Sequence, residues 1–247
     1  MKIAVIVSQT PDTTTKIVIA ADGKTIDESG ITWILNPYAE FAIEKALKLK
    51  EANPKIEEVI LVAMGPERSV EALRQGLAMG ADRAVLIKST VMNTEELATE
   101  IKKLGVDLIL GGKKTIDLES SWTEAGVAAY MDLPYIHTAN KLEWDGDQIL
   151  ASREAAGEKQ TFKVTLPALI SCDKGNDEPR YASIMGIMKA KKKPLDEVAS
   201  SAADNIGVTI VASQLPTARQ AVKIFDGSPA EAAGKLIQAL REEAKVL

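Results

Sequence analysis

The sequence predicts an α/β protein with a mostly parallel sheet flanked by helices, and two observations lead to this class. Short apolar runs at residues 3–7, 58–63, 84–87 and 107–110 are typical of strands that are buried on both faces. Segments with helix-start and helix-stop residues separate these runs. The alternation continues to about residue 135, which is the pattern of parallel strands joined by crossover helices.

The predicted helices have recognisable ends. Asn36 is placed to cap the first helix, and the proline after it suits the first helical position. A second helix begins at about residue 67, and Gly80 suits its C-terminal cap. Asn93 and Glu96 have the spacing of a capping box for a third helix. A fourth helix is expected over residues 121–131.

Two Asp-Gly pairs predict hairpins, because this dipeptide favours tight turns between strands. The first pair lies between residues 16–20 and 24–27, and the second joins residues 141–144 to 148–152. Further short strands are predicted at residues 161–165 and 168–172. We expect this second half of the chain to add antiparallel strands to the sheet.

The sequence after residue 175 predicts a long loop and a C-terminal helical arm. Residues 176–203 have an irregular composition with proline, glycine and a lysine run, which indicates a long loop. Ser228 and Glu231 flank a proline and form a capping-box pattern, which predicts a final helix running toward Val246. Residues 214–220 have the composition of a linker. We therefore predict an α/β domain over residues 1–213 and a C-terminal linker and helix over residues 214–247.

Composition excludes several classes of protein. The 247 residues are 46% hydrophobic and 26% charged, as in folded globular proteins, and no apolar run is long enough to span a membrane. The net charge of −5 argues against nucleic acid as the main partner. A single cysteine and a single histidine exclude an internal disulfide framework and sites that need two imidazoles. The N-terminus carries no targeting pattern, and we expect a cytoplasmic protein.

Ligands of open parallel sheets bind beyond the carboxyl ends of the strands. This rule selects the loops at residues 8–13, 64–66 and 111–121, two of which lead toward helix starts that suit a phosphate. Glycine in these loops allows a ligand to approach the backbone, but glycine also serves tight turns, so both interpretations stay open. The first strand is not followed by G-x-G-x-x-G, and the sequence contains no Walker A motif.

The pattern of polar residues predicts no catalytic group and no metal site. His137 lies among apolar and small residues and is interpreted as structural, and Cys172 ends an apolar strand and is interpreted as a core residue. The lysine run at residues 189–193 is either a solvated face or a docking patch for an acidic partner. The apolar residues just before it, including Ile184 and Met185, either return to the core or anchor that partner.

One long motif resembles a known family. The segment Glu178–Ile184 (EPRYASI) followed by Ile187–Lys193 (IMKAKKK) closely resembles the signature of the beta subunit of electron-transfer flavoproteins. Further motifs match in order at residues 36–38, 78–82, 112–113, 116–117, 153–154 and 166–168. The resemblance covers essentially the whole chain.

The resemblance implies a Rossmann-like, adenine-nucleotide-binding subunit that forms a heterodimer with a larger alpha subunit. The redox FAD lies mainly in a mobile domain of that alpha subunit, and the beta subunit commonly holds AMP as a structural nucleotide. The complex carries electrons from acyl-CoA and related dehydrogenases to a membrane quinone oxidoreductase. Redox chemistry then belongs to the cofactor, which agrees with the lack of a predicted acid–base pair.

The resemblance also implies roles for single residues. The AMP region comprises Ile6, Ser8, Asn36, Ala39, Met64, Gly65, Gly112, Ser121, Trp122 and Thr123. Thr13 and Tyr38 fall near FAD. The residues implied in partner binding are Glu154, which faces the flavin domain, and Ile184, Met185, Lys189, Lys191 and Lys192, which belong to a dehydrogenase recognition loop at about residues 178–193.

The chain departs from the family at the nucleotide loop. Trp122 stands where the family usually has glutamine, and Glu124 stands where it usually has glycine. A carboxylate near a phosphate repels it, and Trp122 either fills the adenine space or stacks on the base. Thr13 stands where mitochondrial-type members have tyrosine.

Two other functions are weighed. A beta subunit of an electron-bifurcating flavoprotein would bind a second FAD, but the bulk of the residues at 122 and 124 argues against it. A regulatory nucleotide-binding module would not need the apolar and basic segment at residues 178–193.

Overall fold

The computed structural model describes residues 1–201, 209–218 and 221–247. The chain forms two compact units. The main unit comprises Met1–Lys16 and Glu28–Ile210, and the second comprises Ile17–Asp27 and Val211–Leu247. Within the described ranges, no helix combines the length and the apolar composition that crossing a membrane requires.

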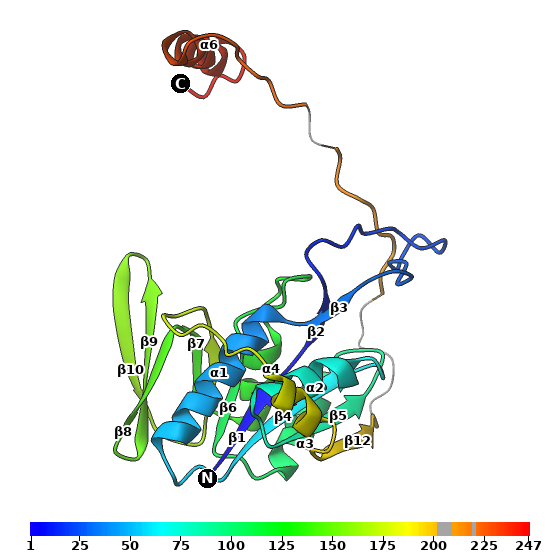
Figure 1. The fold of residues 1–247 in the computed structure, drawn as a ribbon, viewed down its shortest axis with the longest axis vertical. Coiled ribbons are helices and arrows are strands. Elements are labelled where there is room, and N and C mark those ends of the chain that lie inside the picture. Colours follow the sequence, from blue (N-terminus) through cyan, green and yellow to red (C-terminus); the bar gives the residue numbers. More distant parts are fainter. Residues whose placement is uncertain (202–208, 219–220) are drawn as a thin grey trace. The chain divides into compact units, whose positions relative to one another are not determined.

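The main unit is built on a seven-stranded sheet in which every pairing is parallel (Figure 1). Its strands are β1 (Lys2–Ile6), β4 (Glu58–Gly65), β5 (Arg83–Lys88), β6 (Leu108–Gly112), β7 (Tyr135–Ala139), β11 (Ala168–Cys172) and β12 (Leu195–Ala199). They lie in the order β12-β5-β4-β1-β6-β11-β7. The central strands are almost wholly buried, as their continuous apolar runs predict.

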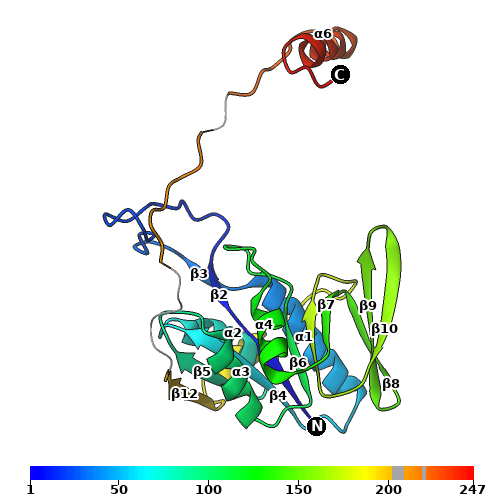
Figure 2. The same cartoon turned by 180° about the vertical axis from the view of Figure 1, so that it is seen from behind.

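Helices cover both faces of this sheet, which confirms the predicted fold class. Helices α1 (Pro37–Ala52) and α2 (Ser69–Met79) pack on the face toward the viewer in Figure 1. Helices α3 (Thr94–Lys103) and α4 (Thr123–Met131) pack on the other face, which Figure 2 shows from behind. Two separate apolar cores result, one on each side of the sheet.

The antiparallel strands form sheets of their own. Strands β8 (Lys141–Asp145), β9 (Gln148–Ala155) and β10 (Glu158–Val164) make a three-stranded sheet, and β2 (Gln9–Pro11) pairs with β3 (Trp33–Leu35). The antiparallel strands expected in the second half are present as β8, β9 and β10, but they form a separate sheet instead of adding to the main one. The predicted strand at residues 168–172 is β11, which runs parallel between β6 and β7, because an apolar run does not encode its direction of pairing.

The segment predicted as an irregular loop over residues 176–203 contains two regular elements, and its last two residues lie outside the described ranges. Helix α5 (Ile184–Ala190) packs on α2, and β12 is the edge strand beside β5. Asp196 and Glu197 of β12 pair with Arg83 and Lys88 of β5, while Leu195 and Val198 pack against the two apolar cores, so only part of this strand carries an apolar pattern. β7, which the sequence did not predict, also lies at an edge.

In the second unit, α6 (Pro229–Glu242) begins with the predicted capping box between Ser228 and Glu231. The predicted hairpin around Asp22 is reduced to a turn and one isolated bridge between Ile19 and Ile26. Residues 219–220 of the predicted linker lie outside the described residues.

Candidate functional site

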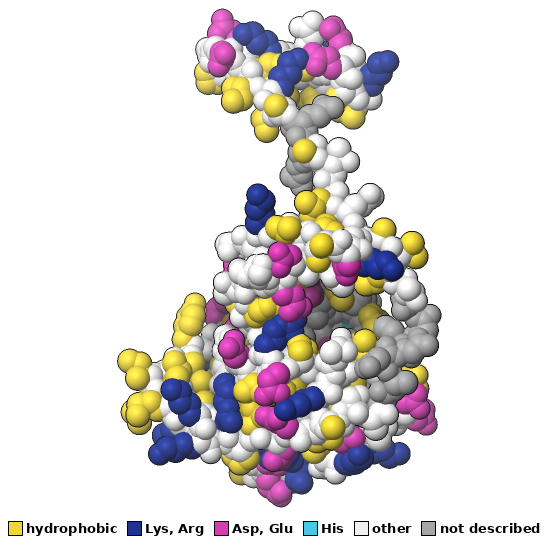
Figure 3. Space-filling model, turned by 90° about the vertical axis from the view of Figure 1, so that its right-hand side faces the viewer, with side chains coloured by type: hydrophobic (Ala, Val, Ile, Leu, Met, Phe, Trp, Pro, Cys, Tyr) yellow, Lys and Arg dark blue, Asp and Glu magenta, His cyan; other side chains and the backbone are white. Residues whose placement is uncertain are grey.

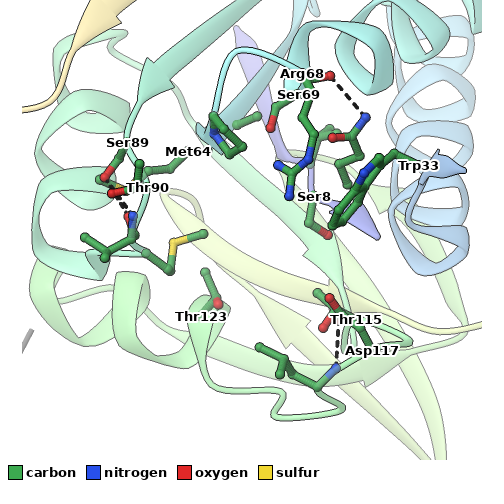
Figure 4. Close-up of a pocket in the computed structure, with 18 of the residues that line it drawn as sticks. Ser8, Trp33, Met64, Arg68, Ser69, Ser89, Thr90, Thr115, Asp117 and Thr123 are labelled. Atoms are coloured by element: carbon green, nitrogen blue, oxygen red, sulfur yellow. Dashed lines mark hydrogen bonds between the residues drawn. The ribbon is translucent and has the colours of Figure 1, made fainter. Parts of the chain in front are cut away.

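A cleft of about 390 Å³ opens at the carboxyl ends of the central strands (Figure 4). Its walls come from the segments that follow β1, β4, β5 and β6. The chain runs outward from β1 to β4 and β5 and then crosses back to β6 on the other side of β1, so the strand order reverses beside β1. Ligands of open α/β sheets bind at such switch points, and the volume is in the usual range for small-molecule sites.

Most of the predicted AMP region meets at this edge. Ser8, Trp122 and Thr123 line both the cleft and a smaller inner cavity beside it. Met64 and Gly65 line the cleft alone, whereas Ile6, Asn36, Gly112 and Ser121 line the inner cavity. Ala39 does not reach either space, because it is buried behind Gly112, on which a Cβ atom would lie 3.0 Å from the Ala39 nitrogen.

Arg68 and Trp33 form one wall of the cleft, and the sequence reasoning missed both. The guanidinium of Arg68 lies 3.6 Å from the centre of the Trp33 ring, a cation–π contact that Figure 4 shows beside Ser8. Its Nη2 donates to Glu28, which balances its charge. Arg68 follows a buried strand, so its position in the sequence could have identified it as a residue of the cleft. Trp33 could not be identified in this way, because it lies on β3, a strand that the apolar pattern does not reveal.

The helix starts that ring the cleft are not capped by side chains. The N-cap residues Asn36 of α1, Arg68 of α2 and Trp122 of α4 make no side-chain capping bond. By contrast, α3, α5 and α6 are capped by Asn93, Ser183 and Ser228, respectively. The predicted capping role of Asn36 is therefore wrong: its Nδ2 instead donates to the Lys114 carbonyl at 2.9 Å, which orients the side chain into the inner cavity.

The inner cavity, about 50 Å³ in volume, contains a buried acid. Glu124 is 7% exposed, and burial raises its pKa to about 7. Its side chain lies against the end of β6, since a Cβ atom on Gly111 would be 2.6 Å from Oε1 of Glu124. Its own backbone N–H, at the start of α4, offsets only a small part of this rise in pKa.

Within the described residues, two buried polar groups near this acid lack a hydrogen-bond partner. Asn36 is 2% exposed, and within the described part of the chain its Oδ1 has no hydrogen-bond partner. The buried hydroxyl of Thr115 also has no hydrogen-bond partner within the described part of the chain. Lys114 lines the cavity, but its ammonium bonds to Glu119. The cleft of about 390 Å³ adjoins this cavity, and a phosphate placed in the cavity would lie against the buried carboxylate of Glu124.

The loop that leads to α4 is strained. Glu119 and Ser121 have φ values of 53° and 54°, in the left-handed region that residues with a Cβ atom rarely adopt. Such strain is concentrated at ligand-binding segments, where the surrounding contacts hold it in place.

The two residues predicted near FAD lie outside the lining of the cleft. Tyr38 begins α1, and the ammonium groups of Lys113 and Lys114 lie 4.9 Å and 5.9 Å from its ring centre. Thr13 follows β2 and is exposed. Each ammonium is also paired with a carboxylate, Lys113 with Asp173 and Lys114 with Glu119, so the charge of both cations beside the ring is balanced within the chain.

The dehydrogenase-recognition residues lie on and after α5. Ile184, Met185, Ile187 and Met188 are 48–81% exposed, and only Ala190 of this helix is buried. Lys189, Lys191 and Lys192 are exposed beside them. Figure 3 shows hydrophobic side chains that project at the edge of the main unit next to basic ones.

Lys193, the last lysine of the run, has a different role. Its Nζ donates to the carbonyls of Leu77 and Ala81 at the end of α2, and burial lowers its pKa. Arg74 of α2 also donates to the carbonyls of Ala190 and Lys193. The lysine run therefore consists of an exposed part and an anchor that fixes α5 to α2.

An ion-pair clamp holds the chain that enters α5. Arg180 donates from Nε and Nη2 to both oxygens of Glu44 at 2.8 Å and 2.9 Å, and from Nη1 to Glu51 at 2.6 Å. The Glu44 side chain is only 4% exposed, so Arg180 neutralises a buried carboxylate of α1. Glu154, the residue predicted to face the flavin domain, is exposed on β9 and belongs to a different surface.

The remaining polar candidates agree with their structural interpretation. His137 Nδ1 lies 2.9 Å from the Tyr135 hydroxyl and 3.1 Å from the Ser171 hydroxyl, within the sheet. Cys172 is fully buried, and burial raises its pKa to about 12. Across residues 1–201, 209–218 and 221–247, the structure contains no group of acidic, cysteine and histidine side chains that could hold a metal ion.

Comparison with known proteins agrees with this geometry. The family model "Electron transfer flavoprotein domain" matches residues 23–203. The chain is 39% identical over 261 residues to the electron transfer flavoprotein subunit beta of Bacillus subtilis, with 100% of each chain covered. It is 38% identical to that of Syntrophomonas wolfei (100% of this chain and 98% of the relative) and 34% identical to the human protein (80% and 81%). The chain therefore belongs to the family of electron transfer flavoprotein beta subunits.

Proposed function

We propose that this chain is a non-enzymatic electron-carrier subunit whose alpha partner holds most of the FAD of the heterodimer. Electrons would arrive from acyl-CoA or related dehydrogenases and leave to a membrane quinone oxidoreductase. FAD supplies reversible redox chemistry when it is bound, so the task of this chain is to position the cofactor and to dock the donors. The cleft at the carboxyl edge would hold a structural adenine-containing ligand.

The observation that carries this proposal is the exposed apolar surface of α5 beside three exposed lysines. A groove of about 630 Å³ lies between α2 and α5 and is lined in part by Ala78, Tyr181 and Ile187. Exposed Ile and Met side chains next to a basic patch suit a partner with an apolar pocket and an acidic rim. The basic residues would speed the encounter, and the apolar ones would hold the complex.

The alpha subunit would cover other surfaces. Tyr38 and Thr13 would contact the edge of FAD, and Glu154 would contact the domain that carries it. Helix α6 has no buried residue, and Leu236 and Ile237 on it are 46% and 44% exposed. An amphipathic helix with an uncovered apolar face is typical of a partner-packing arm, so we assign α6 to the alpha interface.

Cofactor content tests the carrier role. The chain is co-expressed with its alpha subunit, and the nucleotides released from the denatured complex are quantified by chromatography. One FAD per heterodimer is expected. Two FAD per heterodimer would instead identify a bifurcating flavoprotein, and none would contradict both functions.

The docking role is tested at Ile184, which is 81% exposed. We expect Ile184→Ala to lower the second-order rate of electron transfer from a dehydrogenase about thirtyfold, which is the scale of an interface hot spot. The FAD content should not change. The matched control is Tyr130→Ala, which truncates an exposed side chain on α4, 59% exposed, away from α5. Unchanged transfer in the Ile184 variant would refute this assignment.

A further inference from the structure

The inner end of the cleft has the wrong charge for a nucleotide phosphate. A helix start normally favours an anion, because its free N–H groups and the helix dipole carry partial positive charge. At the start of α4 this place is already taken by an acid of the chain, because Glu124 is buried in the first turn with its carboxylate against the end of β6. The Glu124 carboxylate therefore occupies the place at this helix start where the phosphate of a ligand would otherwise bind.

The space itself is also filled by Glu124. Its carboxylate and Cγ lie where a Cβ atom on Gly111 would come within 2.6 Å, so the side chain occupies the hollow at the end of β6. The cavity that remains beside it is about 50 Å³, room for a hydroxyl group or a water molecule. A dianionic phosphate would have to displace the carboxylate or approach it closely.

The acceptor atoms that line the cavity without a partner in the described part of the chain favour a ligand that donates hydrogen bonds. Asn36 is fixed by its bond to the Lys114 carbonyl, and its Oδ1 is buried and unpartnered within the described residues. Buried polar atoms normally have partners, so this acceptor and the Glu124 carboxylate together favour a ligand that donates hydrogen bonds. A carboxylate that accepts the hydroxyls of a ribose is a known way to bind one.

The adjoining cleft has a shape and composition that suit a nucleoside base. Met64, Met92 and Trp122 give it apolar surfaces on which a flat ring can lie. Its cation, Arg68, stacks on Trp33 and donates from Nη2 to Glu28, which balances its charge, while its buried Nε has no partner within the described residues.

We infer that Glu124 and Asn36 make this cleft a site for an uncharged nucleoside rather than for a nucleoside monophosphate. This inference rests on the proposed function, because it names the ligand class of the structural site in the same subunit. The base lies in the cleft, and the ribose hydroxyls donate to Glu124 and to Oδ1 of Asn36.

The test uses the purified heterodimer and two ligands that differ only in the phosphate, adenosine and AMP. Calorimetric titration at pH 8 is expected to show binding of adenosine, with AMP at least about tenfold weaker because of the repulsion by Glu124. In Glu124→Gln the affinity for AMP should rise about tenfold or more relative to adenosine. Glu124→Gly, which also opens the hollow at Gly111, should shift the ratio in the same direction.

The control is Asp117→Asn, which removes a carboxylate that lines the same cleft but is exposed to solvent. Its charge is screened, so the ratio of the two affinities should stay within about twofold of the wild-type ratio. The inference is overturned if wild-type protein binds AMP as tightly as adenosine, if it binds neither, or if Glu124→Gln leaves the ratio unchanged. FAD content and electron transfer are measured on the same samples, so a failure of the carrier function is recognised separately.

Discussion

Replacing Glu124 by glutamine should change how the stability of the protein depends on pH. Glu124 ordinarily would titrate near 4.5, but burial raises its pKa in the folded protein to about 7. Between these values the folded state holds a proton that the unfolded state has released. Stability therefore falls as pH rises through this window and levels off above about pH 7.

The size of the effect follows from the two pKa values. At about 1.4 kcal/mol for each pKa unit, ionising Glu124 destabilises the folded protein by about 3 kcal/mol at pH 8. The glutamine side chain of the variant cannot ionise and avoids this loss. The difference in free energy of unfolding between Glu124→Gln and wild type should thus be about 1 kcal/mol in favour of the variant at pH 5 and reach about 3 kcal/mol at pH 8.

The neighbouring groups do not reproduce this profile. Tyr135 and Cys172 interact electrostatically with Glu124, and burial raises both of their pKa values, so both stay neutral in this range. His137, which bonds to Tyr135, is present in both proteins, so its titration cancels in the difference. Lys114, which lines the same cavity, keeps its charge, because its bond to Glu119 raises its pKa.

The assay is thermal unfolding of the heterodimer, wild type and variant, at several pH values from 5 to 8. For a chain of this size, 1 kcal/mol corresponds to about 2–4 °C in Tm. The gap between the two melting temperatures should widen from pH 5 to about pH 7 and change little from pH 7 to pH 8. A constant gap, or a variant that is less stable at pH 8, would refute the reasoning. Asp117→Asn provides the exposed control and should show a flat gap.

Three further predictions concern other parts of the chain. Cys172, with its buried thiol and raised pKa, should resist iodoacetamide in the native protein and react fully after unfolding, as mass spectrometry can measure. Arg180→Ala leaves the buried carboxylate of Glu44 without its partner and should lower stability by about 3–5 kcal/mol in denaturant titrations, whereas a variant at the exposed pair of Lys141 should change it by less than about 1 kcal/mol. Asn93→Ala removes the side-chain cap of α3 and should lower stability by about 1 kcal/mol in the same titrations.

Central elements of the fold could be predicted because buried strands and helix ends have characteristic local sequence patterns. Strands such as β1 and β4 are buried on both faces, so each is a continuous apolar run. Helix ends at Asn93, Gly80 and Ser228 use local chemistry that the sequence displays. The position of the cleft follows from these elements, because parallel strands bring their carboxyl ends to one edge.

Peripheral elements could not be predicted, because contacts distant in the sequence stabilise them. β12 is an edge strand with two acidic residues, and its ladder with β5 and the packing of Leu195 and Val198 on the cores are contacts between distant parts of the sequence. Helix α5 has seven residues and buries only one of them, and its close approach to α2 requires Gly186, where a Cβ atom would lie 2.6 Å from the Ala78 carbonyl. A helix this short is not stable alone, so tertiary contacts decide its existence.

Two residues of the inner cavity depart from the usual preferences for residues at helix starts. Asn36 stands at a helix start beside a proline, yet its side chain leaves the helix uncapped and turns to the inner cavity. Glu124 stands in the first turn of α4, where an acid is normally exposed and stabilising, yet it is buried with a raised pKa. Each arrangement alone is destabilising, and both line the same cavity of about 50 Å³. Because sequences depart from local rules mainly where function requires it, two independent departures that meet at one cavity point to a ligand whose hydrogen bonds would satisfy both.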